Sequence, residues 1–194
     1  MVSKSTRKSE MFTLLQRLGR NSNGGAMLEF AFAMPILIGL VMGGVEFARF
    51  ALVNQKMERV TSFVGDFVAR AEALDEADFG DYFAAAQQLG VPFDLFSDGN
   101  IIVTSVTGQS SGPEVLWQQI GAGSVTQASK IGAPGDAATL PENFNVDEGE
   151  GLVITEVYFD FEPLLLPGLI SAHRLYYQAI YRPRRTAILA LQQE

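Results

Sequence analysis

One carboxylate, that of Glu29, stands at the beginning of a long apolar segment. Uncharged residues follow it without interruption from Phe30 to Val45. An acidic side chain at the centre of a bilayer costs roughly 2.5–3.5 kcal/mol, so we expect an interaction that offsets this cost. Two explanations remain open. Glu29 has a functional role that offsets this cost, or it simply occupies a helix N-terminus, which stabilises a carboxylate by about 0.3–1 kcal/mol.

The residue types give little support for catalysis. The chain has no cysteine, which excludes disulfides, thiolate zinc sites and cysteine nucleophiles. Its one histidine, His173, would have to serve any Ser-His-Asp triad, but no Gly-x-Ser-x-Gly motif accompanies it. The glycine-rich segment 121–123 lacks the lysine of a phosphate-binding loop. We therefore predict a surface or turn histidine, no cofactor and no enzymatic activity.

Each cluster of charged side chains can be explained either as a solvated surface group or as a binding site. Two acidic groups have the oxygen ligands that calcium prefers but lack EF-hand spacing, so a solvated helix start and an acidic loop are favoured over a metal site. A basic group near the C-terminus indicates a solvated strand end or a contact with an acidic face of another subunit or an anionic polymer. The acidic groups are Asp75, Glu76, Asp78, Asp81 and Asp147, Glu148, Glu150; the basic group is Arg182, Arg184, Arg185.

The apolar segment has the length of a membrane span. With Gly25 to Leu28 added, the run to Val45 reaches the roughly 20 residues that a spanning helix needs. A secretory signal would end in a small-x-small cleavage site, but here the run continues into helix-compatible residues from Glu46. We expect one helix from about Gly25 to Ala73, transmembrane to about residue 45, with Pro35 either a tolerated membrane proline or a hinge.

The charge distribution indicates the orientation in the membrane. Residues 1–28 carry five basic residues and one acidic residue, whereas residues 46–194 carry nine basic and twenty acidic residues. Positive residues before a span stay in the cytoplasm, so we predict a single-pass protein of the inner membrane with a cytoplasmic N-terminus and a periplasmic or extracellular C-terminal domain. The lipid bilayer is an expected partner; nucleic acid is not, because an acidic domain repels phosphates.

Three domains follow from these patterns. Residues 1–24 are a polar, basic cytoplasmic leader, in which Met11 to Leu18 form a short amphipathic helix and Asn21 to Gly25 are extended and accessible. Residues 25–73 form the long helix. Residues 74–194 form an exported α+β globular domain.

The exported part begins with a helix and continues with an antiparallel sheet. Outside the membrane, the long helix carries an apolar stripe that is expected to pack on the domain that follows: Phe50, Val53, Met57, Val60, Val64, Phe67, Val68. A helix is predicted over 75–89, with Asp75 as N-cap and Asp78 at the capping-box position. Strands are predicted over 100–107, 114–120, 152–161 and 175–181, with a long loop over 121–149.

A glycine five residues before a lone carboxylate, behind a basic leader, is the layout of a prepilin-type signal. The segment from Gly24 to Pro35, together with Glu46-Phe47-Ala48-Arg49, resembles the opening of TadE-like proteins, the minor pseudopilins of tight-adherence (Flp-type) pili. Residues 156–164 and 181–184 resemble the C-terminal part of that family. Tight-adherence prepilins commonly have tyrosine after the glutamate; this chain has Phe30, which favours a minor subunit over the main pilin.

This resemblance implies processing by a prepilin peptidase between Gly24 and Gly25. Glu29 would then be the fifth residue of the mature chain and, beside Phe30, would act in assembly by pairing with the new α-amino group of Gly25 in its own or a neighbouring subunit. The implied partners are other pilin and minor pseudopilin subunits, an inner-membrane assembly platform and its ATPase. The alternative is a periplasmic binding or adhesion domain held by an uncut signal anchor.

Overall fold

The computed structural model describes residues 22–71, 75–121, 123–141, 144–167 and 171–183. The chain divides into two compact units, Met1–Glu46 and Phe47–Glu194. The leader before Ser22, including the helix predicted over Met11 to Leu18, lies outside the described residues.

The long helix, α2, spans Ser22–Arg70, 49 residues or about 73 Å at 1.5 Å per residue. It begins three residues earlier than predicted, so the expectation of an extended segment is wrong from Ser22 to Gly25. Helix extension is cooperative, and about 1 kcal/mol per glycine does not stop it once the following turns form. The helix also ends before the predicted Ala73, because Ala71 is already outside it.

Two short helices follow α2. Helix α3 spans Glu76–Gly90, and the predicted capping residues lie where they were expected: the backbone N–H of Asp75 donates to the Asp78 carboxylate at 3.1 Å. Helix α4, Leu95–Asp98, was not predicted. Its cap is Asp94, whose carboxylate accepts hydrogen bonds from the N–H groups of Phe96 and Ser97.

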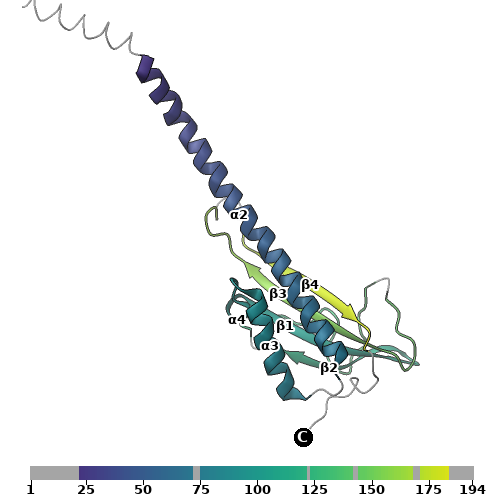
Figure 1. Ribbon diagram of the computed structural model, residues 1–194. Helices are drawn as coiled ribbons and strands as arrows, with labels where there is room; N and C mark the ends of the chain where they lie inside the picture. Colours follow the sequence, from purple (N-terminus) through teal and green to yellow (C-terminus); the bar gives the residue numbers. More distant parts are fainter. Residues whose placement is uncertain (1–21, 72–74, 122, 142–143, 168–170, 184–194) are drawn as a thin grey trace, which may run out of the picture. The chain divides into compact units, whose positions relative to one another are not determined.

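The four predicted strands are confirmed. They are β1 (Gly99–Gln109), β2 (Gly112–Ile120), β3 (Gly151–Phe161) and β4 (His173–Tyr181). All neighbours are antiparallel, in the order β2-β1-β3-β4 (Figure 1). The chain is therefore α+β, a long apolar helix followed by an antiparallel sheet, as its sequence predicts.

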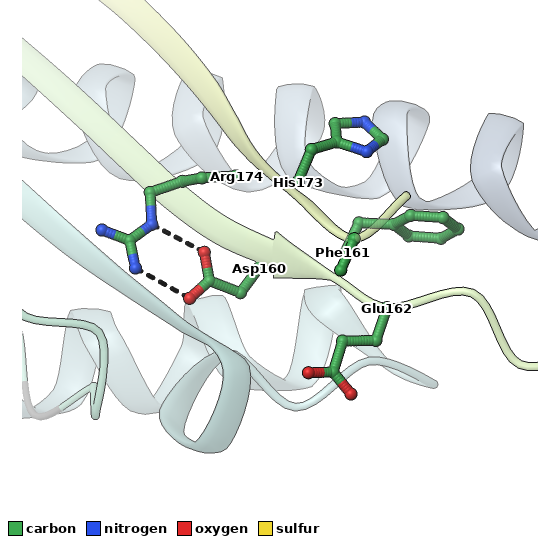
Figure 2. A pocket seen from close by; sticks show the side chains of 6 residues that line it. Asp160, Phe161, Glu162, His173 and Arg174 are labelled. Atoms are coloured by element: carbon green, nitrogen blue, oxygen red, sulfur yellow. Dashed lines mark hydrogen bonds and ion pairs between the residues drawn. The ribbon is translucent and has the colours of Figure 1, made fainter. Parts of the chain in front are cut away.

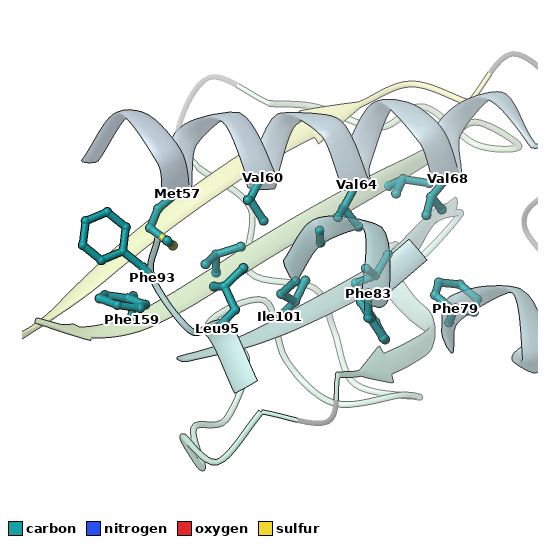
Figure 3. Packing of buried hydrophobic residues seen from close by; sticks show 14 of the residues in the cluster. Met57, Val60, Val64, Val68, Phe79, Phe83, Phe93, Leu95, Ile101 and Phe159 are labelled. Atoms are coloured by element: carbon teal, nitrogen blue, oxygen red, sulfur yellow. The ribbon is translucent and has the colours of Figure 1, made fainter. Parts of the chain in front are cut away.

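One face of the sheet is covered by the second half of α2 and by α3. The α2 residues Val53, Met57, Val60, Val64 and Val68 are fully buried in one cluster with strand residues. Figure 3 shows Met57, Val60, Val64 and Val68 pointing toward the strands. This confirms the predicted stripe except at Phe67, which is 49% exposed. Its ring instead lies beside those of Phe63 and Tyr82, with centroids 5.3 Å away in both cases.

The helix and the sheet approach each other closely at Gly65. A Cβ atom built there would lie 2.7 Å from the ring of Tyr181 on β4 and 3.1 Å from Oγ1 of Thr155 on β3. A side chain at this position would therefore push α2 away from the sheet, which explains a glycine in the middle of the helix despite its low helix propensity.

The other face of the sheet is covered by the long connection between β2 and β3. Its residues Val125, Ile131 and Val146 are buried against strand side chains, in two clusters that also contain Ile154 and Tyr158 of β3. The predicted loop over 121–149 thus has no helix or strand in its described residues, but it forms a second layer of core. As a result, β3 is buried on both faces along most of its length.

Candidate functional site

The residues predicted for processing and assembly lie together in the first turns of α2. Gly24, Gly25, Glu29 and Phe30 are all exposed, and no atom lies within 4 Å of a Cβ built at either glycine. Gly25 and Glu29 are four residues apart in the helix, so they share one face with a rise of about 6 Å between them. Their roles in processing and assembly remain predictions.

The first half of α2 presents apolar side chains to its surroundings on all sides. Its large apolar residues from Met27 to Val41 are exposed, among them Met27 (77%) and Phe32 (71%). The helix is long and apolar enough to cross a membrane, and among the described residues it is the one helix that is. A helix that is apolar all round and uncovered by protein is suited to lipid, which indicates that this half of α2 is a membrane anchor.

A second candidate site is an open hollow of about 370 Å³ at one end of β3 and β4 (Figure 2). The Arg174 guanidinium donates two hydrogen bonds to the Asp160 carboxylate, at 2.6 and 2.8 Å. These bonds lower the pKa of Asp160, so its carboxylate is a poor proton donor at neutral pH. His173 is exposed, as predicted, and its Nδ1 lies 3.0 Å from the carbonyl oxygen of Ser171. The polar groups of this hollow thus hold its two strands together.

Arg49 connects the same end of the sheet to α2. Its Nη1 donates to the Glu162 carbonyl oxygen at 2.6 Å, and its guanidinium carbon lies 5.2 Å from the centroid of the Phe161 ring. Sequence reasoning noticed Arg49 only as part of a motif and did not predict this contact. The signal was a basic residue directly after an apolar run, which does not by itself identify a partner more than 100 residues away.

The remaining charged clusters have ordinary environments where they are described. Arg182 forms an ion pair with Glu150 at 2.8 Å, whereas Arg184 and Arg185 lie outside the described residues. In the described parts of the chain, no three Asp, Glu or His side chains converge as a metal ion would require.

A buried carboxylate that the sequence did not single out lies on the loop-covered face. The Glu156 side chain on β3 is fully buried. Its Oε1 accepts hydrogen bonds from the Lys130 N–H and the hydroxyls of Tyr158 and Tyr176, each at 3.0 Å, and its Oε2 accepts one from the Ser129 hydroxyl. Burial, followed by the charge of Glu156, raises the pKa of both tyrosines. The cluster ties the β2–β3 connection to the sheet.

Comparison with known families finds one match, which covers the first part of α2. Residues 24–64 match the TadE-like protein family. The match begins at the predicted processing glycine, contains Glu29 and Phe30, and continues through the anchor into the buried stripe of α2. No curated protein and no solved structure matches the chain.

The match confirms the TadE-like resemblance predicted from the sequence. TadE-like proteins are structural proteins associated with Tad pili, and the chain combines the TadE-like segment with a transmembrane helix. Residues 24–64 thus resemble a family of pilus-associated proteins, and the same segment contains the apolar half of α2. The helix that carries this segment, α2, continues without a break from Ser22 to Arg70.

Proposed function

We propose that this chain is a minor pseudopilin that acts in the assembly or initiation of a tight-adherence (Flp-type) pilus. A prepilin peptidase cuts it between Gly24 and Gly25. The observation that carries the proposal is that the TadE-like match begins at Gly24 and contains Glu29 at the entrance to an exposed apolar helix. The product is structural and not an enzyme. It works with other pilin and pseudopilin subunits, an inner-membrane platform and its ATPase.

The geometry supplies a physical reason for the two glycines. Peptidases bind extended substrates, and Gly24 and Gly25 lie in the first turn of α2. Each glycine weakens a helix by about 1 kcal/mol relative to alanine, so this turn unwinds more easily than any later one. No neighbouring side chain lies within 4 Å of their Cβ positions to oppose this.

Cleavage also gives Glu29 its role. The new ammonium group at Gly25 lies at the positive end of the helix dipole, an unfavourable position for a cation. A carboxylate one turn away offsets both charges, either within the chain or across to the amine of a neighbouring subunit during docking. A subunit entering the fibre thus buries a neutral pair instead of a lone charge.

The proposed domain organisation places the cleavage site and the membrane span in the first part of the chain. Residues 1–24 remain in the cytoplasm until they are removed, residues 25–73 form the helix that crosses the inner membrane up to about residue 45, and residues 74–194 form the exported domain. The positive charge of the leader and the acidic excess of the domain support this orientation.

The first test determines the N-terminus of the membrane-extracted protein by mass spectrometry. We expect a mature chain that begins at Gly25, and Gly24→Arg should abolish cleavage while leaving membrane insertion intact. Gly19→Arg, the same change five residues upstream, serves as the control and should be cut normally. Finding only the intact leader in cells with an active prepilin peptidase would refute the processing step.

The second test separates an assembly subunit from an uncut anchor. Glu29→Ala should be cut and inserted at normal protein level but should give few or no pili. Glu58→Ala removes an exposed carboxylate farther along α2 and should leave pilus number unchanged. Wild-type pilus counts with Glu29→Ala as the sole source of the protein would instead favour a signal-anchored binding or adhesion domain.

A further inference from the structure

The connection between β3 and β4 contains three successive leucines, Leu164 to Leu166, between Pro163 and Pro167. Leu164 is 71% exposed, and Leu165 and Leu166 are half-buried. Single exposed leucines are common on protein surfaces, but three in a row on one short connection form a contiguous apolar tip that needs an explanation.

Both ends of this connection are held against the same turn of α2. At its start, Arg49 donates to the Glu162 carbonyl oxygen at 2.6 Å. The Phe50 ring lies 5.3 Å from the Phe161 ring on β3 and 5.8 Å from the His173 ring on β4, centroid to centroid. Figure 2 shows Phe161 and His173 on their two strand ends. The leucine tip is therefore anchored beside residues 49 and 50.

This position lies close to the end of the transmembrane segment along the chain. Arg49 is four residues after Val45, the last residue of the apolar run. Four helical residues rise about 6 Å, and even a fully extended chain of four spans at most about 14 Å. The headgroup layer on each side of the hydrocarbon core is itself about 5–8 Å thick. The attachment of the leucine tip is therefore within reach of this layer along the chain.

We propose that Leu164 to Leu166 insert into the outer interface of the bilayer that α2 spans. Apolar side chains on interfacial segments bury themselves about 5–10 Å into the boundary between headgroups and acyl chains. The occupant of the apolar tip is thus lipid, in continuity with the lipid around the anchor. The tip gives the exported domain a second attachment that limits its rotation about the helix before the subunit leaves the membrane.

The absence of cysteine from the chain allows a direct test. Leu164→Cys is labelled with an environment-sensitive fluorophore in the full-length protein, reconstituted in phosphatidylethanolamine and phosphatidylglycerol vesicles that contain lipids spin-labelled near the headgroup. We expect a blue-shifted emission, at least twofold stronger quenching by the spin-labelled lipid than at a distal site, and weak quenching by aqueous iodide. The fluorescence of Trp117 reports that the domain remains folded.

The matched distal site is Phe144→Cys. Phe144 is also an exposed apolar residue, 43% accessible, but it lies at the opposite end of the sheet. Its neighbour Asn145 accepts from Arg182 through its carbonyl oxygen, and Arg182 pairs with Glu150 just before β3 begins. Eleven residues of β3 separate this end from Phe161, roughly 30–35 Å. This label should be quenched by iodide and not by lipid.

Phe32→Cys in the apolar run is the positive control and should be quenched by lipid labelled deeper in the acyl chain. Equal lipid quenching at positions 164 and 144 would overturn the proposal. So would a blue shift at position 164 without lipid quenching, since this result would indicate a protein partner such as a second copy of the chain. An unquenched label at position 32 would remove the membrane span on which the proposal depends.

Discussion

Removing the Glu156 carboxylate tests whether the buried cluster on β3 holds the second layer of the core. In Glu156→Ala, the N–H of Lys130 and the hydroxyl of Tyr176 lose the acceptor that the structure gives them. Tyr158 retains one contact, at 3.3 Å to the Ala128 carbonyl oxygen. A fully buried donor without an acceptor costs about 1–3 kcal/mol, and these two part-buried donors should cost the lower part of that range. With the cavity left by the side chain, we expect the free energy of unfolding to fall by about 3–5 kcal/mol.

Glu156→Gln is the matched control because it keeps the shape of the side chain. Its amide oxygen has two lone pairs and can accept from the Lys130 N–H and the Tyr176 hydroxyl, while Tyr158 keeps its contact with the Ala128 carbonyl oxygen. The Ser129 hydroxyl can rotate to accept from the amide nitrogen. The variant loses charge assistance but also avoids burying a charge, so the two effects oppose each other. We expect its stability to lie within about 1 kcal/mol of wild type.

The assay is urea unfolding of the full-length protein in detergent micelles, followed by the fluorescence of the buried Trp117, the only tryptophan of the chain. Trypsin adds a local readout, because it cleaves after Lys130 and should do so faster in Glu156→Ala. An alanine variant within about 1 kcal/mol of wild type would refute the reasoning. A glutamine variant as unstable as alanine would show that the charge itself, and not the hydrogen bonds, holds the connection.

Four other variants test the helices and the helix-covered face of the sheet, each by the same urea titration. Gly65→Ala should destabilise by about 1–3 kcal/mol because the new methyl group collides with the sheet, whereas Gly80→Ala, with open space at its Cβ on α3, should stabilise by up to about 1 kcal/mol. Thr155→Val should stabilise by about 1 kcal/mol, because the buried hydroxyl has no hydrogen-bond partner. Burial, with a smaller effect of Glu58, raises the pKa of Tyr177 to about 12. Because a tyrosine in the unfolded chain titrates near pH 10, the free energy of unfolding should fall between about pH 10 and 12. In Tyr177→Phe this fall should be less steep.

Local periodicity predicted the elements of this fold well. The recurrence of valines after residue 50 identified the buried stripe of α2, and β-branched runs bounded by glycine and proline identified all four strands to within two residues. The incorrect predictions of secondary structure concern segments in which the local sequence pattern is short or is overridden by neighbouring structure. The four-residue helix α4 is too short for periodicity, although Asp94 before Ser97 was a usable capping signal.

The β2–β3 connection shows what local patterns cannot predict. Its composition of glycine, alanine, serine and proline correctly indicates a segment without helix or strand. However, Val125, Ile131 and Val146 are too far apart in sequence to show any period, so nothing indicated that they form a core layer. The candidate site depends on a different kind of signal. Gly24, Gly25 and Glu29 were selected by their spacing relative to an apolar run, which needs no tertiary contact.

Two unexpected features of the sheet both lie on β3, and for one reason. The alternation of this strand correctly predicted that Thr155 and Glu156 occupy opposite faces, because side chains alternate with a period of two. It did not predict what covers each face. Thr155 lies under Gly65, where the helix is too close for a partner to reach the hydroxyl, and Glu156 lies under the loop, whose backbone supplies one of its donors. A period of two assigns each strand residue to one face of the sheet. Whether a polar side chain on that face finds hydrogen-bond partners depends on the distant segment that packs against it.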